Sequence, residues 1–362
     1  MKKVGIFTYM LSNYGAVLQC YALHKYIREE LHYDAEVVDF TTDEHLKSLS
    51  PFNNTINNPV KRLIYNMYVL LFRLYRINQR NKKTQKFKRD NIVFSKRYST
   101  MQELLQNPPK EDYYVSGSDQ VFNLNSDYYK VYYLAFNKGN AKKVAYATSI
   151  AHTQLDENYW GKIEEYVMDF DSLSSREETG AFFLSKMTGK AVPVVVDPTM
   201  LLTVKEWLKI AQPPKYKEDY IFIYDLNGGE DLVRIAHNIK DKTKLKIICL
   251  TNSVMKRYKV DYQLYSAGPS EFVGLIANAS YVVTDSFHGS VFSIIFSKPF
   301  YTYIAVEHTS TRITNLLNSL GLSDHLITLS SIDESQQLPR PVSVELNSYT
   351  SSSKEYLNNI FD

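Results

Sequence analysis

Short apolar, β-branched runs alternate along this chain with longer stretches in which apolar positions recur at helical spacing. In the first half the short runs predict strands at residues 4–9, 36–40, 113–116, 143–149, 171–175 and 192–196. The stretches between them predict helices, most clearly at residues 16–30, 159–169 and 177–186. Alternation of this kind is typical of an α/β fold whose sheets are mainly parallel.

The alternation breaks at residues 212–215, where the sequence reads Gln-Pro-Pro-Lys, and then starts again. A strand is predicted at 220–226, a helix at about 229–239 and another strand at 245–250. We therefore predict an N-terminal α/β domain at 1–212 and a C-terminal one at 213–330. Residues 331–362 turn to Ser, Gln and Pro before a last short helix at 354–361, and we expect this tail to pack back on the N-terminal domain.

A helical insert at about residues 60–90 does not follow this pattern. Between Lys61 and Arg89 there are ten basic residues and no acidic one. Apolar residues recur beside them at helical spacing, at Leu63, Ile64, Met67, Leu70, Leu71, Leu74 and Ile77. Two interpretations stay open: a helix packed on its own domain with a solvated basic edge, or a helix lying on an anionic membrane surface.

Composition narrows the class of protein. A length of 362 residues favours two domains, and a net charge of +3 is too small to indicate a nucleic-acid partner. Cys20 and Cys249 lie in apolar segments without disulfide or metal spacing, which predicts core packing in a reducing compartment such as the cytoplasm. The first nine residues resemble an opening strand rather than a secretion signal, and no apolar run reaches spanning length.

The stretch from Ser280 to Ser290 carries the densest candidate chemistry. An apolar strand at 281–284 runs directly into Asp285, Ser286 and His288. Gly289 is expected to permit a tight turn before a helix at 290–297. Open parallel sheets bind their ligands at the carboxyl ends of strands, so these side chains are candidates for a functional site.

Two earlier strand ends carry polar clusters as well. At Asn13-Tyr14-Gly15 the backbone N–H groups of a helix start could hold a phosphate or a sugar hydroxyl, although plain N-capping explains the same residues. After the strand at 113–116 come Ser118, Asp119 and Asn123. Asp119 is placed to accept a proton from an acceptor hydroxyl or to orient it; the alternative is a capping aspartate.

Two arginines at the ends of predicted elements are candidate anion binders. Arg176 follows the strand at 171–175, and Arg312 begins an amphipathic helix. A guanidinium makes planar bidentate contacts with carboxylate or phosphate. Either arginine could equally be a structural ion-pair partner, as Arg176 would be with Glu177 or Asp171. Asp197 begins Asp-Pro-Thr, which is typical of a structural turn.

Taken together, these motifs resemble the polysaccharide pyruvyl transferase family in order and spacing, over roughly residues 4–325. The matching segments are Asn13-Tyr14-Gly15 with Leu18-Gln19, Gly117-Ser118-Asp119-Gln120-Val121, Ser175-Arg176-Glu177, Asp197-Pro198-Thr199, Thr284-Asp285-Ser286-Phe287-His288-Gly289, Lys298-Pro299-Phe300 and Arg312-Ile313.

The resemblance implies two Rossmann-like domains in a GT-B-like arrangement with an interdomain cleft. It also implies transfer of an enolpyruvyl-derived group from phosphoenolpyruvate to a sugar, usually as a cyclic pyruvate ketal, without a metal or organic cofactor. The acceptor would belong to a cell-surface polysaccharide such as a capsule or exopolysaccharide, or to its polyprenyl-diphosphate-linked precursor. The polyprenyl-diphosphate-linked acceptor would bring the protein into peripheral contact with the inner membrane.

The resemblance also suggests roles for single residues. His288 matches a histidine near phosphoenolpyruvate and is assigned as the acid, with Asp119 as the base. Arg176 matches an arginine that holds the donor's phosphate or carboxylate. Several family members have arginine where this chain has Ser286, and Arg312 is the candidate to compensate.

The remaining assignments follow from position in these motifs. The expected donor-binding residues are Arg176, Ser286, Arg312 and Gly289. The expected acceptor-binding residues are Asn13, Tyr14, Gly15, Ser118 and Asn123. Asp285 is a further expected site residue without a specific role. Two other functions stay open: a GT-B glycosyltransferase using a nucleotide sugar, and a non-catalytic glycan-binding member.

Overall fold

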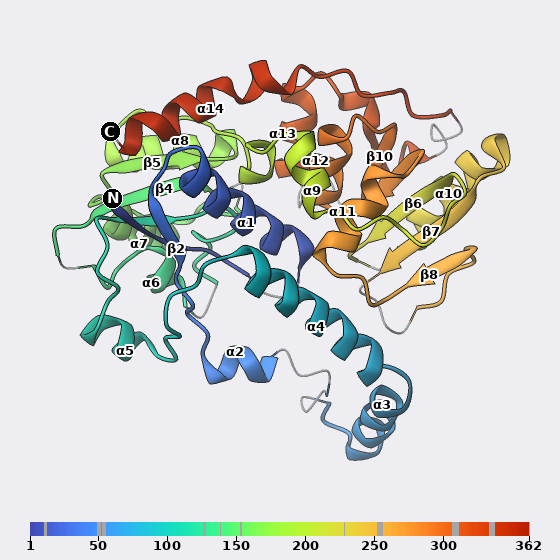
Figure 1. Cartoon of the computed structure of the whole chain (residues 1–362), viewed down its shortest axis with the longest axis horizontal. Coiled ribbons are helices and arrows are strands. Elements are labelled where there is room, and N and C mark those ends of the chain that lie inside the picture. The colour runs from blue at the N-terminus through green and yellow to red at the C-terminus, as the bar shows by residue number, and fades with distance from the viewer. Residues whose placement is uncertain are drawn as a thin grey trace. The chain divides into compact units, whose positions relative to one another are not determined.

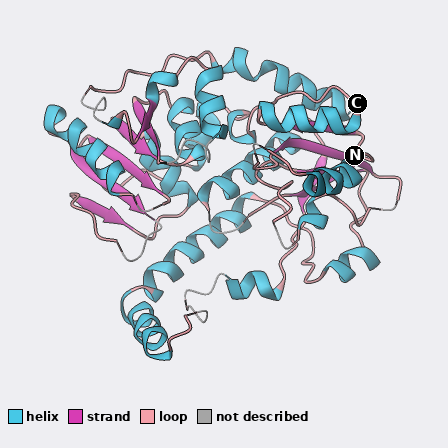
Figure 2. Cartoon of the chain, turned by 180° about the vertical axis from the view of Figure 1, so that it is seen from behind, coloured by secondary structure: helices cyan, strands magenta, loops and turns pink. Residues whose placement is uncertain are grey.

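Two parallel sheets with helices around them make up the computed structural model of the chain (Figure 1, Figure 2). The structure describes residues 1–10, 13–48, 52, 56–125, 128–137, 139–152, 154–227, 229–251, 256–305, 311–332 and 337–361.

The chain divides into two compact units, each built from separate segments of sequence. Unit 1 comprises Met1–Thr42, Lys88–Thr203 and Glu345–Asp362, and unit 2 comprises Asp43–Phe87 and Val204–Val344. The division drawn from the sequence differs in three respects. Residues 43–87, which include most of the helical insert, fall in unit 2 instead of the N-terminal domain. The boundary lies at 203–204 instead of 212–213, and residues 331–344 of the tail belong to unit 2.

Unit 1 contains a five-stranded sheet in the order β2-β1-β3-β4-β5. Each neighbouring pair is parallel. All four residues of β3 are buried, as expected for a parallel strand covered on both faces. The strands are β1 (Lys3–Phe7), β2 (Asp34–Val37), β3 (Tyr113–Ser116), β4 (Lys142–Thr148) and β5 (Ser172–Ser175).

Helices connect and cover these strands. The helical elements of unit 1 are α1 (Tyr14–Glu29), α5 (Met101–Gln106), α6 (Tyr129–Tyr132), α7 (Glu157–Val167), α8 (Glu178–Thr188), the 3-10 turn η1 (Pro198–Met200) and α14 (Leu346–Phe361). Phe361, at the end of α14, lies against the rings of Tyr33 and Tyr113, with centroids 5.0 Å away in both cases. The backbone N–H of Val196 donates to Ser353 Oγ of the same helix at 3.0 Å.

The strand predicted at residues 192–196 is wrong. Only an isolated bridge forms there, between Val194 and Ser175. Pro193 has no N–H to donate, and the N–H of Val196 is used by Ser353, so a ladder beside β5 cannot extend. The segment instead leads Asp197 into η1.

Unit 2 contains a six-stranded parallel sheet in the order β11-β10-β9-β6-β7-β8. All six residues of β6 are buried, which places this strand at the centre of the core. The strands are β6 (Tyr220–Asp225), β7 (Lys246–Thr251), β8 (Tyr262–Leu264), β9 (Tyr281–Thr284), β10 (Phe300–Ile304) and β11 (Leu326–Thr328).

The helical elements that begin in unit 2 are α2 (Asp43–Ser48), α3 (Pro59–Phe72), α4 (Leu74–Asn91), α9 (Val204–Ile210), α10 (Glu230–Thr243), α11 (Pro269–Ala277), α12 (Phe287–Ile295), α13 (Thr311–Ser319) and the 3-10 turn η3 (Ser323–His325). The long helix predicted for the basic insert is in fact two helices, α3 and α4, which meet at Arg73. The last residues of α4 belong to unit 1.

The predicted α/β class with two mainly parallel sheets is confirmed. The predicted core role of the two cysteines also agrees with the structure, since both are buried free thiols. Burial raises the pKa of the Cys20 thiol to about 12, so the nucleophilic thiolate is scarce at neutral pH. No helix in the described ranges combines the length and apolarity needed to cross a bilayer.

Candidate functional site

A buried ion-pair network lies at the carboxyl ends of the strands of unit 1. Arg176, directly after β5, donates to Asp197 Oδ2 at 3.0 Å and to Asp119 Oδ1 at 3.2 Å. The Arg176 side chain is 1% exposed and that of Asp197 is 1% exposed, while that of Asp119 is 19% exposed. Asp119 is therefore the member of the network that solvent reaches.

The charges of this network stabilise each other. Burial acts to lower the pKa of Arg176, but the carboxylates of Asp119, Asp197 and Glu177 outweigh it and raise that pKa. The guanidinium stays charged and is committed to two carboxylates. This matches the ion-pair alternative, with Asp119 and Asp197 as partners in place of Glu177 or Asp171.

The backbone around Asp119 is strained. Asp119 has φ of 81°, in the left-handed region that only a few per cent of non-glycine residues adopt. Ala147 and Ala151 also have positive φ, at 55° and 64°, and an isolated bridge joins Asp119 to Thr148. Such conformations persist only where their surroundings hold them, and they are common at functional sites.

Ser118 connects this network to the first helix. Its hydroxyl donates to Asp197 Oδ2 at 3.1 Å, and its carbonyl accepts from Thr8 Oγ1 at 2.8 Å. Gln19 of α1 in turn donates to Thr8 Oγ1 at 2.8 Å. Ser118 is fully buried, so it supports Asp197 and does not face solvent.

The other residues predicted to bind acceptor have local structural roles. Asn13 is the N-cap of α1, and its side chain accepts from the N–H of Gly15 at 2.9 Å. Tyr14 and Gly15 form the first turn of α1 and are buried. Asn123 accepts from the N–H of Asn125 at 3.0 Å in a local turn. Plain capping thus accounts for the geometry of Asn13.

In unit 2, the junction of β9 and α12 brings four of the predicted residues together. Ser286 is the N-cap of α12 and accepts from the N–H of Gly289 at 3.3 Å. Its own N–H donates to Thr284 Oγ1 at 3.1 Å. His288 is in the first turn of α12, is 6% exposed and meets the Phe287 ring edge-on at 5.2 Å.

Gly289 is not the turn expected from the sequence. It is the third residue of α12, because the cap at Ser286 starts the helix earlier than predicted. A Cβ at Gly289 would lie 2.3 Å from Thr284 Oγ1, so glycine is required for the close approach of helix and strand end. Gly289 therefore lets the first turn of α12, which includes His288, pack closely against the end of β9.

Asp285 holds the neighbouring loop. Its carboxylate accepts from the N–H groups of Leu226 at 2.9 Å and Asn227 at 3.0 Å, and from Asn227 Nδ2 at 2.7 Å. Burial raises the pKa of Asp285 and the charge of Asp225 adds to this, while those hydrogen bonds act in the opposite direction. Asp285 fixes the carboxyl end of β6 against that of β9.

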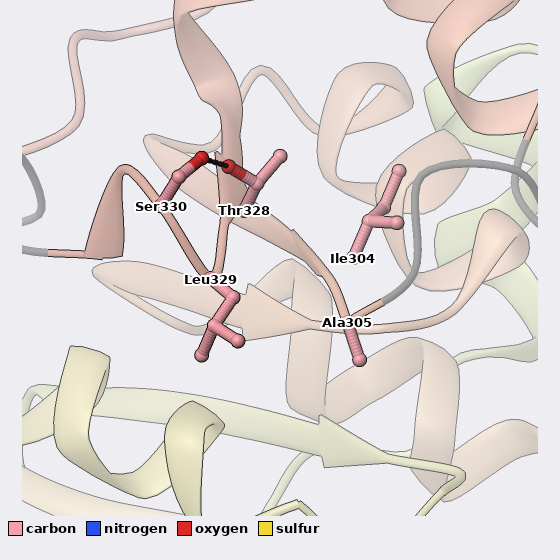
Figure 3. Close-up of a pocket in the computed structure, with 5 residues that line it drawn as sticks. All are labelled: Ile304, Ala305, Thr328, Leu329 and Ser330. Carbon is pink, nitrogen blue, oxygen red and sulfur yellow. Dashed lines mark hydrogen bonds between the residues drawn. The ribbon is translucent and has the colours of Figure 1, made fainter.

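Arg312 and a pocket at the edge of the sheet complete the description of unit 2. Arg312 is half-buried in the first turn of α13. A pocket of about 320 Å³ lies at the carboxyl ends of β10 and β11; Figure 3 shows its lining, Ile304, Ala305, Thr328, Leu329 and Ser330. The Thr328 and Ser330 hydroxyls are hydrogen-bonded to each other at 2.8 Å, and none of the five described lining residues has a charged side chain.

Sequence reasoning missed Asp225, and it considered the buried Glu177 only as a partner of Arg176. Asp225 ends β6 and accepts from Thr251 Oγ1 at 2.7 Å and Tyr258 OH at 2.9 Å. Glu177 accepts from Ser149 Oγ at 2.7 Å. The signal that identified Asp285, an acidic residue directly after an apolar strand, would have found Asp225 too.

Among the described residues, no group of three or more His, Cys, Asp or Glu side chains could hold a metal ion.

Sequence comparison decides the family. The sequence model of the polysaccharide pyruvyl transferase family matches residues 13–308, which include the candidate residues of both units except Arg312. The chain belongs to the polysaccharide pyruvyl transferase family. Membership in this family makes it a transferase, and the resemblance seen in the motifs is confirmed. No curated protein sequence matches the chain significantly.

Solved structures confirm the fold. UDP-N-acetylglucosamine 2-epimerase from Methanocaldococcus jannaschii superposes with a TM-score of 0.54 at 13% identity, covering 100% of this chain and 99% of that one. The enzyme of the same name from Rickettsia bellii gives 0.53 at 10% identity, covering 100% and 96%. At such identities the likeness shows the GT-B type of fold alone.

Proposed function

We propose that this family member transfers an enolpyruvyl-derived group from phosphoenolpyruvate to a sugar and forms a pyruvate ketal. The acceptor would belong to a capsule, an exopolysaccharide or a polyprenyl-diphosphate-linked precursor, and the reaction would take place in the cytoplasm. The family match over residues 13–308 supports the reaction class. The observation that carries the proposal is Asp119, a solvent-reached carboxylate held in a strained conformation by a buried arginine.

The chemistry needs one acid and one base. His288 would give a proton to the methylene carbon of phosphoenolpyruvate, while a sugar hydroxyl gives its proton to Asp119 and bonds to the adjacent carbon. A second hydroxyl of the sugar then displaces phosphate from that carbon and closes the ketal; its proton returns to His288, and the proton held by Asp119 leaves with the phosphate. Two C–O bonds, one C–H bond and one phosphate O–H bond form, while the C=C π bond, two sugar O–H bonds and the C–O bond to the phosphate break.

Arg176 would act through Asp119 and Asp197. Both of its carboxylate partners lie within 3.2 Å, and its side chain is 1% exposed, so binding a phosphate would require breaking buried ion pairs. We propose that its charge keeps Asp119 ionised and fixed in direction. Ser118 would support the same arrangement through Asp197. The predicted contacts with the acceptor sugar remain Asn13, Tyr14, Gly15 and Asn123.

The donor would be bound by unit 2. Phosphoenolpyruvate is strongly anionic, and the N-terminus of α12 offers partial positive charge beside His288. Ser286 and Gly289 shape that helix start, and Asp285 fixes the loop next to it. Arg312, at the start of α13, is the proposed guanidinium for the donor.

The transfer can be followed with phosphoenolpyruvate labelled with carbon-13 at the carbon that becomes the ketal, mixed with a glycan extract of the producing cells. We expect phosphate release and a new ketal carbon signal. Asp119→Asn should slow both by about 10²–10⁴-fold. Asp34→Asn, which changes an exposed carboxylate of the same unit, should not. Consumption of a nucleotide sugar with no use of phosphoenolpyruvate would contradict the proposal and favour a glycosyltransferase.

A further inference from the structure

Helix α3 exposes an apolar face. Its residues at spacings of three, four and seven form one stripe along the helix, and all are between 51% and 64% exposed. The stripe consists of Val60, Leu63, Ile64, Met67, Leu70 and Leu71. Tyr75, at the start of α4, continues it and is 75% exposed. In both Figure 1 and Figure 2, α3 stands apart from the six-stranded sheet of its own unit.

Near the C-terminal end of α3, the face opposite the stripe is buried and partly polar. Val69 is 1% exposed, and Arg73, at the end of the helix, is 3% exposed. The Arg73 guanidinium lies 4.7 Å from the centre of the Tyr68 ring and donates to its hydroxyl at 3.3 Å. A helix packed on its own domain would bury its leucines and expose its arginine. Here the order is reversed, so packing within the described chain does not account for the stripe.

The charged residues of the segment that carries the stripe have one sign. Between Lys61 and Arg89 there are ten basic residues and no acidic one. Lys61 and Arg62 are exposed on α3 itself, and Arg76 and Lys82 are exposed on α4. Lys83 is paired with Glu271, but the segment offers no carboxylate of its own. A binding partner that covers the stripe of α3 must therefore accept apolar side chains and carry negative charge.

A second copy of the chain is a poor partner. In a two-fold interface the same basic segment would lie on both sides, so the positive charges of the two copies would repel each other. A bilayer with anionic lipids offers both chemistries in one surface, with acyl chains for the stripe and headgroups for the lysines and arginines. At about 1.5 Å per residue, the 14 residues of α3 reach only about 21 Å, too short to cross the roughly 30 Å of hydrocarbon.

We propose that α3 is a membrane-docking helix that lies in the interface of an anionic bilayer with its apolar stripe inserted. This proposal is independent of the donor and of the transfer chemistry. It predicts that the protein reaches acceptors carried at a membrane surface.

Binding to vesicles tests the proposal directly. The full-length protein is sedimented with vesicles of phosphatidylcholine plus phosphatidylglycerol, and with vesicles of phosphatidylcholine alone. We expect binding to the first that is at least about tenfold tighter than to the second and that weakens with salt. Leu63→Gln with Leu71→Gln should weaken binding at least about tenfold, since two inserted side chains are lost. Lys61→Glu with Arg62→Glu should remove the preference for phosphatidylglycerol.

A matched control separates the stripe from exposed leucines in general. Leu105 on α5 and Leu208 on α9 are 45% and 50% exposed. Changing both to glutamine should leave vesicle binding unchanged. A tryptophan placed in the stripe by Met67→Trp should shift its fluorescence to shorter wavelength on anionic vesicles. This reports insertion of the stripe into the bilayer while keeping the side chain at position 67 apolar.

Two results would overturn the proposal. The first is absence of wild-type binding to anionic vesicles together with an unshifted Met67→Trp spectrum. The second is a wild-type dimer in light scattering that Leu63→Gln with Leu71→Gln converts to monomer, because the stripe would then be covered by a second copy. Neither result depends on whether phosphoenolpyruvate is the donor.

Discussion

At the scale of single residues, Arg176 has the most consequential environment. It lies between two carboxylates, one fully buried and one within reach of solvent. The sequence showed an arginine at a strand end but could not show its partners, since Asp119 and Asp197 are 57 and 21 residues away. The geometry supports a positioning role, which is tested through stability as well as activity.

Arg176→Met should lower the free energy of unfolding by about 3–5 kcal/mol, because the buried carboxylate of Asp197 and the partly exposed one of Asp119 lose their counter-charge. Urea denaturation measures this loss. Arg28→Met is the control: Arg28 and Asp34 form a pair at 3.1 Å whose side chains are 35% and 51% exposed, so its loss should cost at most about 1 kcal/mol. Equal losses in both variants would argue against a buried network at Arg176.

Glu111 should make stability depend on pH. Burial, aided by the charge of Glu36, raises the pKa of Glu111 to about 7. A carboxyl group whose pKa is raised by folding binds its proton more tightly in the folded state, so stability rises as pH falls through about 7 and is lost as pH rises. Glu111→Gln should therefore stabilise the protein more at about pH 8 than at about pH 5. An equal effect at both pH values would show that Glu111 titrates normally.

At the scale of elements, the β9–α12 junction illustrates what sequence patterns can and cannot give. The strand at 281–284 was predicted with its true bounds, since four apolar or β-branched residues precede a polar cluster. The helix was predicted to start at 290 and starts at Phe287, because Ser286 caps it. A glycine near a strand end indicates a turn from sequence alone; its close approach to Thr284 is visible only in three dimensions.

Gly289→Ala should destabilise the protein by about 1–3 kcal/mol, because the new methyl group overlaps Thr284 and forces α12 away from β9. Gly161→Ala is the matched control. Gly161 also lies inside a helix, α7, but nothing lies within 4 Å of a Cβ there, so alanine should stabilise by about 0.5–1 kcal/mol. Thermal unfolding of both variants measures the contrast, and a neutral Gly289→Ala would contradict the packing role.

The basic insert marks the limit of periodicity arguments. Helical spacing was predicted correctly, yet it cannot tell which face is buried. The same sequence pattern is compatible with a helix on a membrane and with a helix packed on its own domain. The exposed apolar stripe of α3 favours the helix on a membrane.

At the scale of the whole molecule, alternation of strands and helices was sufficient to predict the fold class. It was not sufficient to predict which segments share a unit, because the chain passes between the units at residues 42–43, 87–88, 203–204 and 344–345. Periodicity carries no information about which sheet a given helix packs on. The order of motifs identified the family, and the family match over residues 13–308 confirms it.

The central claim is that unit 2 binds phosphoenolpyruvate at His288. Calorimetric titration of the wild type, His288→Ala and His237→Ala tests it, since His237 is a half-buried histidine of the same unit whose Nε2 lies 2.8 Å from the carbonyl oxygen of Lys259. We predict saturable binding that His288→Ala weakens at least about tenfold and His237→Ala leaves unchanged. Binding of UDP but not of phosphoenolpyruvate, with or without glycan extract, or binding of phosphoenolpyruvate that His288→Ala does not weaken, would contradict the account.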